Sequence, residues 1–407
     1  MLTDIFKNTN VIERLYHRSG GAYLDDYTDW LAERHYQDST IISYVYAADR
    51  FLTWTQEEGY KIEDLAQSTL ADYKSFLATT SASDLRYERS NSYCGARRLL
   101  IFFQEIGLTP LTDDDFPPLI AEFCKWMRTL RNVKDSTLKA YTRIIHHLLR
   151  TLGEEPSDYT AEGLRTFVLQ QTSDFSVSHT ETVVTSTRMF IRFLIATKRC
   201  AAELQYSIPR VSGWRLSSLP GYLSEEDIEQ IIIHCDPSTA QGARDRAIIL
   251  LLARLALRGC DVSALKLADI DWNMGKIRIS GKVHHADWLP LPQEVGDAIL
   301  YYLEQVRLKV NHQAVFLIMH APYTGIQSRQ VSEVAARAIS NTGISTSGGV
   351  YLFRHSVATL MLRKGVSLKN IGVLLRHKNV DTTLIYAKVD VKNLRQIAQP
   401  WPGGELC

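Results

Sequence analysis

The stretch that decides the fold is Lys276-Ile277-Arg278-Ile279-Ser280, in which charged or polar side chains alternate with isoleucines, as in a half-buried strand. Gly281-Lys282-Val283-His284-His285 supplies a turn, and Trp288-Leu289-Pro290-Leu291 supplies a returning strand. The pattern predicts an antiparallel hairpin with Lys282 in its turn. Because the patterns around it are helical, we expect a mainly α chain that contains an α+β domain with one small antiparallel sheet.

Helical periodicity surrounds this hairpin on both sides. Apolar residues recur at helical spacing over Ser224–His234, Ala240–Ala256, Gln293–Val310 and Arg329–Ile339. The first of these segments opens with Ser-Glu-Glu-Asp, a capping-box pattern. We therefore expect a third domain over 222–390, which follows a linker at 211–221 and precedes a C-terminal tail at 391–407.

The first 210 residues contain an internal sequence repeat. Asp-Ser-Thr stands at 38–40 and again at 135–137, an offset of 97 residues, and each copy is expected to cap a long helix that follows a shorter helix with a tryptophan. A second repeat relates Arg98 to Arg188. We expect two related helical modules, at 1–112 and 113–210. Chance recurrence of amphipathic helices is the alternative interpretation.

Composition excludes several classes of protein. The chain has 407 residues with 46 Lys plus Arg and 45 Asp plus Glu, so the total charge gives no sign of a nucleic-acid partner. Its six cysteines form no CxxC pair, and no histidine cluster has metal-ligand spacing, so we expect no metal site, no disulfide framework and a cytoplasmic location. Neither a signal peptide nor an apolar run of about 18 residues is present, which predicts no membrane contact.

Two arginines of the third domain are candidates for binding a phosphate. Arg258 and Arg354 stand among apolar residues, and burying such cations without an anion is unfavourable. Forked, permanently charged donors suit phosphate oxygens, whereas surface ion pairs are the ordinary alternative. We expect Arg354 at the start of a helix that runs to about Lys364, and Asp261 placed to orient Arg258.

Three further residues complete a candidate site. A phenol such as that of Tyr386 has a pKa near 10 and is a poor nucleophile unless nearby cations, here the two arginines and His377, stabilise the phenolate. Lys282 at the hairpin tip could reach a DNA groove and protonate a departing sugar oxygen. The plain alternatives are a half-buried helical aromatic for Tyr386 and a solvated turn lysine for Lys282.

The order and local context of these residues resemble the tyrosine recombinase family, the phage-integrase-like site-specific DNA recombinases. The likeness is strong over Tyr222 to Val389 and looser over Lys134 to Lys198 and Pro209 to Leu223. Six strings carry it: Leu257-Arg258-Gly259-Cys260-Asp261, Leu265-Lys266-Leu267-Ala268-Asp269-Ile270, Gly281-Lys282, Leu352-Phe353-Arg354-His355-Ser356-Val357-Ala358-Thr359, Leu374-Leu375-Arg376-His377 and Thr382-Thr383-Leu384-Ile385-Tyr386.

The resemblance implies SAM-like helical core-binding modules followed by a catalytic domain. It implies that Tyr386 attacks a DNA phosphate to give a 3′-phosphotyrosyl intermediate, while Arg258 and Arg354 neutralise the phosphorane, His377 adds a hydrogen bond and Lys282 acts as general acid. The expected enzyme is a DNA strand transferase that needs neither metal nor ATP and has no cofactor. Its expected partners are double-stranded DNA, three further copies in a homo-tetramer on paired sites, and companion recombinases.

Two positions depart from the family pattern. Tyr351 stands where the family usually has histidine, and Arg376 replaces the usual glycine before His377. Tyr351 can still donate a hydrogen bond to a phosphate, although it is a weaker base than an imidazole.

Alternative functions are relaxation of DNA like that of a type IB topoisomerase, DNA binding with a decayed active site, and an unrelated helical scaffold.

Charge differs between the expected domains. Residues 1–110 carry a net charge of −5, residues 111–220 a net charge of +2 and residues 221–407 a net charge of +4. The last two suit a clamp around a DNA duplex, and the acidic first module is more suited to a protein partner.

Overall fold

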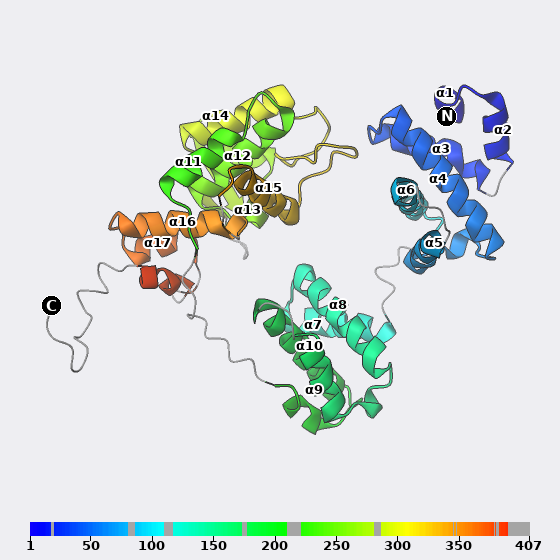
Figure 1. Ribbon diagram of the computed structural model, residues 1–407, viewed down its shortest axis with the longest axis horizontal. Coiled ribbons are helices and arrows are strands. Elements are labelled where there is room, and N and C mark those ends of the chain that lie inside the picture. The colour runs from blue at the N-terminus through cyan, green and yellow to red at the C-terminus, as the bar shows by residue number, and fades with distance from the viewer. Residues whose placement is uncertain are drawn as a thin grey trace. The chain divides into compact units, whose positions relative to one another are not determined.

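The computed structural model describes residues 1–17, 20–79, 86–109, 117–172, 177–209, 221–280, 286–344, 346, 348–377, 379 and 382–389 (Figure 1). The chain divides into two compact units. The first comprises Met1–Thr28 and Ser39–Arg215, and the second Asp29–Asp38 and Leu216–Cys407. Helices dominate, and one small antiparallel sheet is present, so the predicted fold class is confirmed. The hairpin turn with Lys282, residues 211–220 of the expected linker at 211–221, and the expected tail at 391–407 lie outside the described residues.

The first half of the leading unit is built around aromatic side chains. Tyr73 lies against Phe51 and Trp54, with ring centroids 5.0 and 5.1 Å away. Gly95 allows helices α4 and α6 to approach closely, because a Cβ at that position would lie 2.4 Å from the Cβ of Ala47. The helices here are α1 (Leu2–Ile5), α2 (Thr9–Tyr16), α3 (Leu24–Glu33, of which residues up to Thr28 belong to this unit), α4 (Asp38–Glu57, which belongs to this unit from Ser39 on), α5 (Gln67–Thr79) and α6 (Arg86–Glu105).

The second half of that unit has its own apolar core. Phe123 meets Phe190 edge to face at 5.5 Å, and both rings are fully buried, together with Ile145 and Leu148. Burial of such apolar surface is the main favourable contribution to folding. The helices are α7 (Pro118–Arg131), α8 (Asp135–Leu152), α9 (Ala161–Gln170) and α10 (Val177–Ala196).

The two halves repeat the same order of elements. In each, a shorter helix precedes a long one, a 3₁₀ turn follows (Ile62–Asp64 or Pro156–Asp158), and a shorter helix leads into another long one. Asp38 and Asp135 are the first residues of α4 and α8. The expected capping role is wrong for Asp135, because the N-cap is Lys134 without a side-chain cap bond. The Asp135 carboxylate instead pairs with Arg128 at 3.1 Å.

The second unit is organised around helix α12, which contacts α14, α15 and α16. Its apolar residues are buried nearly all round, which explains its weak amphipathic pattern. The predicted capping box at Ser224 and Asp227 is present, with both hydrogen bonds at 3.0 Å. The helical elements are α11 (Glu225–His234), α12 (Ala240–Leu255), α13 (Gly259–Ser263), α14 (Gln293–Tyr301) with a π-helical extension (Tyr302–Val306), α15 (Ser328–Asn341), α16 (Val350–Arg363), α17 (Leu368–Leu374) and the 3₁₀ helix η8 (Leu384–Val389).

The sheet of this unit has three strands in the order β1-β2-β3. They are β1 (Ile270–Asp271), β2 (Lys276–Ser280) and β3 (Ala286–Pro290), all antiparallel. The alternation that predicted β2 is confirmed, since Ile277 and Ile279 are buried and Ile277 pairs with Leu289. The sheet also includes β1, whose two residues are too short a run to show a period.

Candidate active site

Arg258 is placed by a tight turn between two helices. Ala256 ends α12 in a left-handed conformation, with φ of 49°, and Arg258 then serves as the N-cap of α13. The backbone N–H of Arg258 donates to Oδ2 of Asp261 at 3.1 Å. Its guanidinium Nη2 donates to the carbonyl oxygens of Leu375 and Arg376, both at 3.2 Å. The turn therefore directs Arg258 toward the end of α17.

Arg354 lies in the second turn of α16, because that helix begins at Val350, so the expected place at the helix start is wrong. The residue is 4% exposed. Its Nη1 donates to the carbonyl oxygen of Ala256 at 2.6 Å, and its Nη2 makes a short hydrogen bond to that of Leu375. Burial, and next the charge of Arg258, lower the pKa of Arg354 to about 10, so it is still a cation at neutral pH.

The two arginines meet at one acceptor. The Leu375 carbonyl oxygen receives an N–H from Arg258 and another from Arg354. Two forked cations that share a single neutral oxygen form a strongly electropositive centre. An oxygen of a phosphate is the kind of acceptor that such a centre binds well.

His377 stands beside this centre, just after α17. Its Nδ1 is 2.8 Å from Oγ1 of Thr383, which leaves Nε2 as the other ring nitrogen for contacts. Burial, and then the charges of Arg354 and Arg258, lower the pKa of His377 to about 4. The imidazole is therefore neutral at neutral pH and carries no charge into the site.

Tyr386 lies on η8, which packs against α16 and α17 (Figure 1). The residue is 2% exposed, and its hydroxyl is 2.9 Å from Nδ1 of His355. Burial raises the pKa of Tyr386, while the charge of Arg354 opposes that rise. The plain alternative for Tyr386, a half-buried helical aromatic, does not describe it, because the phenol is buried, neutral and 2.9 Å from an imidazole nitrogen.

His355 is the residue that sequence reasoning missed. It follows Arg354 on α16, and burial, then the charge of Arg354, lower its pKa. A neutral imidazole that faces a phenol hydroxyl is placed to accept its proton. The only signal in the sequence was a histidine next to the arginine, and nothing in that pattern links it to Tyr386, 31 residues later.

The remaining predicted residues are not brought into this cluster by the described contacts. Tyr351 lies in the first turn of α16 and is 70% exposed. Lys282 lies outside the described residues. Asp261 holds Arg376 at 2.5 Å and lies 3.9 Å from Nη1 of Arg258, so it orients Arg258 mainly through the backbone.

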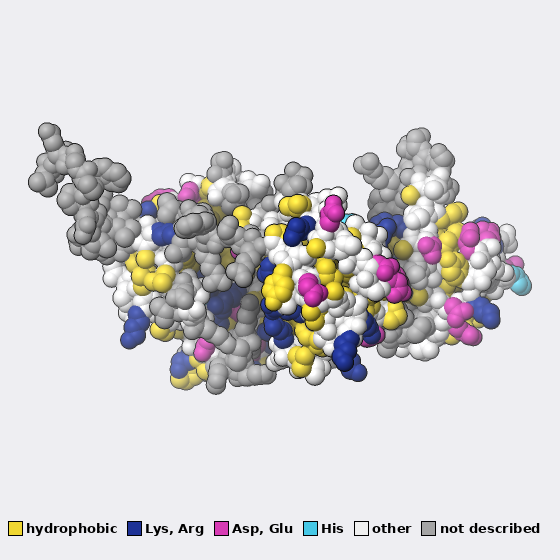
Figure 2. All heavy atoms as spheres, turned by 90° about the horizontal axis from the view of Figure 1, so that it is seen from below, with side chains coloured by type: hydrophobic (Ala, Val, Ile, Leu, Met, Phe, Trp, Pro, Cys, Tyr) yellow, Lys and Arg dark blue, Asp and Glu magenta, His cyan; other side chains and the backbone are white. Residues whose placement is uncertain are grey.

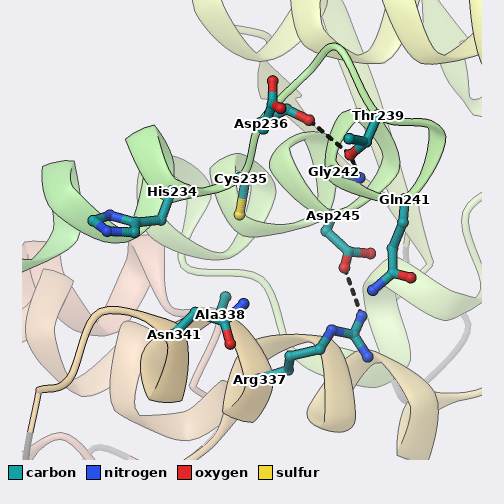
Figure 3. A pocket seen from close by; sticks show the side chains of 10 residues that line it. All are labelled: His234, Cys235, Asp236, Thr239, Gln241, Gly242, Asp245, Arg337, Ala338 and Asn341. Atoms are coloured by element: carbon teal, nitrogen blue, oxygen red, sulfur yellow. Dashed lines mark hydrogen bonds and ion pairs between the residues drawn. The ribbon is translucent and has the colours of Figure 1, made fainter.

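A cavity of about 340 Å³ lies elsewhere in the second unit, between α11, α12 and α15 (Figure 3). Asp245 lies in its wall and pairs with Arg337 at 2.5 Å and with Arg244 at 2.8 Å. Burial raises the pKa of the neighbouring Cys235 thiol to about 11. The predicted site residues are absent from the lining, and the Asp245 carboxylate already holds two guanidiniums, so the cavity is structural in character.

The described residues contain neither a metal-binding group of side chains nor a membrane-spanning helix. Within those ranges, no three His, Cys, Asp or Glu side chains are grouped so as to hold a metal ion. Among the same residues, no helix has the length and apolar character needed to cross a membrane.

The fold and this cluster define a class that comparison with known proteins confirms. The model of the phage integrase family matches residues 221–393. A protein of Sinorhizobium fredii (strain NBRC 101917 / NGR234), named "Putative integrase/recombinase y4rA", is 31% identical over 94% of each chain. The chain belongs to the phage integrase family of tyrosine recombinases, as the sequence strings predicted.

More distant relatives agree. Tyrosine recombinase XerD of Listeria monocytogenes is 27% identical and covers 69% of this chain and 96% of its own. The fold matches XerH site-specific recombinase bound to a palindromic difH substrate, with a TM-score of 0.54, 17% identity and coverage of 83% and 98%. It also matches a lambda integrase dimer bound to a COC′ core site, with a TM-score of 0.52, 17% identity and coverage of 71% and 98%. The chain is a site-specific DNA recombinase, and the alternative functions are not favoured.

Proposed function

We propose that this recombinase cuts and rejoins DNA through a covalent bond between Tyr386 and a 3′-phosphate. One observation carries the proposal: the Tyr386 hydroxyl faces an imidazole at 2.9 Å, within a cluster where Arg258 and Arg354 share the Leu375 carbonyl. A nucleophile, a proton acceptor and two cationic forks are the groups that phosphoryl transfer to a phenol requires.

The reaction balances with groups of the chain and DNA alone. The Tyr386 oxygen forms a bond to phosphorus while the bond from phosphorus to the 5′-oxygen breaks, and the 5′-oxygen leaves as a hydroxyl. The tyrosine proton moves to His355, and Lys282 supplies the proton of the leaving group. Because the phosphotyrosine keeps the bond energy, a 5′-hydroxyl of the partner strand can reverse the step without ATP. No metal is needed for charge neutralisation, since the arginines provide it.

The cluster residues have distinct roles in this proposal. Arg258 and Arg354 exchange their carbonyl partners for the non-bridging phosphate oxygens, where charge increases in the phosphorane. His377 donates from Nε2 while Thr383 occupies Nδ1. Tyr351, exposed near the start of α16, donates to a neighbouring phosphate oxygen. His355 takes the role of base that the usual histidine at position 351 would have had.

The proposed partners are DNA and further copies of the chain. The XerH and lambda integrase structures are of complexes with DNA, and both match this fold. We propose that the module at 113–210 and the domain at 222–390 close on the duplex, and that the module at 1–112 contacts protein. Four protomers assemble on two sites in the cytoplasm, each tail from 391 to 407 docks on its neighbour, and companion recombinases take part. The face seen in Figure 2 carries both basic (Lys, Arg) and acidic (Asp, Glu) side chains. We therefore expect only the basic parts of such a surface to contact the DNA phosphates.

A covalent-trapping experiment tests the reaction. The full-length chain is incubated with nicked suicide duplexes made from inverted repeats that flank its gene, and protein-bound DNA is counted after denaturation. Tyr386→Phe should lower the yield by about 10⁴-fold, because the nucleophile is gone. The matched control is Tyr302→Phe, which removes another buried hydroxyl of the same unit, one that accepts from the Leu317 N–H at 3.1 Å.

The two variants give separable results. Tyr302→Phe should cleave at the normal rate per folded molecule. An unchanged covalent yield in Tyr386→Phe would refute the assigned nucleophile. Relaxation of supercoiled DNA without paired sites would instead support topoisomerase-like action.

A further inference from the structure

Arg376 has a backbone conformation that its side chain does not favour. The residue follows α17 with φ of 53°, in the left-handed region that glycine adopts freely. A strained position of this kind persists when the surroundings fix it, and such positions cluster at functional sites. The side chain at this position therefore calls for an explanation.

The guanidinium of Arg376 is buried but only partly satisfied. Its side chain is 9% exposed, and Nη2 pairs with Oδ2 of Asp261 at 2.5 Å. In the part of the chain that the structure describes, Nε and Nη1 have no hydrogen-bond partner. Buried N–H donors are nearly always paired, so two on one cation mark a place for an acceptor.

The surroundings of Arg376 are the phosphate-binding groups of the proposed site. The Arg376 carbonyl oxygen accepts from Nη2 of Arg258. The charge of Arg376 also acts on Arg354, where it adds to the larger effects of burial and of Arg258 on the pKa. The residue thus lies next to both arginines that are expected to bind the phosphate.

Charge in this cluster is unbalanced. Among the residues that the structure describes, three guanidiniums, those of Arg258, Arg354 and Arg376, face one carboxylate, that of Asp261. The imidazoles of His355 and His377 are neutral, because their pKa values are lowered. A buried excess of positive charge is stabilised by an anion, and a phosphorane carries more negative charge than the phosphodiester from which it forms.

We propose that Arg376 is a third phosphate-binding arginine, in which one of the two free nitrogens, Nε or Nη1, donates to a non-bridging oxygen of the scissile phosphate while Asp261 holds Nη2. The inference rests on the proposed reaction at Tyr386. It assigns to this chain a contact that a glycine before His377 cannot make. The left-handed turn is the backbone geometry that directs this side chain into the cluster.

A test compares two substrates that differ in charge. Suicide duplexes are made with an ordinary scissile phosphodiester or with a methylphosphonate, which lacks the charge of one non-bridging oxygen. Arg376→Gly, which suits the positive φ, should cleave the phosphodiester about 100-fold more slowly than the unaltered chain. In one methylphosphonate diastereomer the methyl group replaces the contacted oxygen. On this substrate the cleavage rate of Arg376→Gly should be less than about threefold below that of the unaltered chain, because the contact is already gone.

A double variant separates direct contact from an effect on Arg258. Loss of Arg376 leaves Asp261 free to draw in Arg258, whose Nη1 is 3.9 Å away. In Asp261→Asn/Arg376→Gly there is no carboxylate to attract Arg258, so a direct contact predicts that the loss on the phosphodiester remains. Recovery of the rate in the double variant would overturn the direct contact.

The matched control is Arg337→Ala, which removes an ion pair with the same 2.5 Å Nη2 to Oδ2 distance, at the cavity of Figure 3. This control should keep the rates on both substrates. Equal losses of Arg376→Gly on both diastereomers and on the phosphodiester would overturn the inference, as would full activity. Arg376→Lys keeps the charge but lacks the forked donors, and it should cleave the phosphodiester about tenfold more slowly than the unaltered chain. This variant tests the inference if Arg376→Gly does not fold. Failure of the unaltered chain to form any covalent adduct would refute the proposed reaction itself, and the inference with it.

Discussion

Asp245 and Asp261 are buried carboxylates of the same unit, each 2.5 Å from an arginine Nη2, yet their surroundings differ. Asp245 lies on α12 and binds two guanidiniums, one from Arg244 on the same helix and one from Arg337 on α15 (Figure 3). Asp261 binds Arg376, whose Nε and Nη1 have no hydrogen-bond partner among the described residues and whose φ is positive. The comparison teaches that the length of an ion pair does not reveal its role. The N–H groups that a guanidinium leaves without an acceptor are more informative about its role.

The largest effect on stability should come from breaking the ion pairs of Asp245. Asp245→Asn removes the charge partner of Arg244, which is 7% exposed, and should lower the free energy of unfolding of the second unit by about 3 kcal/mol. Hydrogen exchange of peptides from α12 in the full-length chain measures this change. Cleavage per folded molecule should stay normal. Loss of cleavage with intact exchange protection would show that the Asp245 centre is not merely structural.

A somewhat smaller effect, on the rate of DNA cleavage instead of on stability, should come from the cluster around Tyr386. His355→Gln removes the acceptor that faces the Tyr386 hydroxyl and should slow covalent-complex formation by about 10²-fold. In the unaltered chain the rate should rise with pH through the lowered pKa of His355, below about 6.5, and the variant should lose that limb. Single-turnover rates on suicide DNA from pH 5 to 8 measure both.

The control for this variant is His234→Gln. Its imidazole is exposed in the same unit, and its Nδ1 lies 2.9 Å from the Gln230 carbonyl oxygen. This control should keep the rate and its pH limb. A normal rate in His355→Gln would assign the base role to another group.

The smallest effect is the dependence of stability on pH. The pKa of His377 is about 4 in the folded chain against 6.5 as its ordinary value, so the unfolded chain binds more protons between these values. The stabilisation is complete above about pH 6.5 and is lost as the pH falls toward 4, with His355 acting in the same direction. The loss should be about 1 kcal/mol for this partly exposed ring. Urea unfolding at pH 7.5 and 5.0 measures it, and His377→Asn should reduce the difference.

Sequence reasoning predicted elements where one local pattern decides the outcome. Alternating isoleucines gave β2, and Ser224 with Asp227 gave the start of α11. The start of α16 was placed too late because Gly349 offers no side-chain cap as a signal. Local patterns also led to a wrong cap at Asp135, where the aspartate lies one residue inside the helix.

The site was predicted where single residue types carry the chemistry, and missed where packing does. Arg258 and Arg354 were placed in one cluster, as their apolar neighbours indicated. The pairing of His355 with Tyr386 depends on η8 packing back onto α16, which no short-range pattern encodes. The left-handed turn at Arg376 is hidden for a similar reason, because an arginine gives no signal of positive φ.

The shared carbonyl of Leu375 has a consequence for how recognition is divided within the molecule. A guanidinium that already donates to the backbone only exchanges partners when it reaches a phosphate, so it gains the difference between two hydrogen bonds. That difference is largest for the most charged form of the phosphate, which exists only at the moment of transfer. In the proposed reaction, the centre therefore contributes selectivity for the transition state, and we expect the strength of DNA binding to come from the surfaces that surround the duplex.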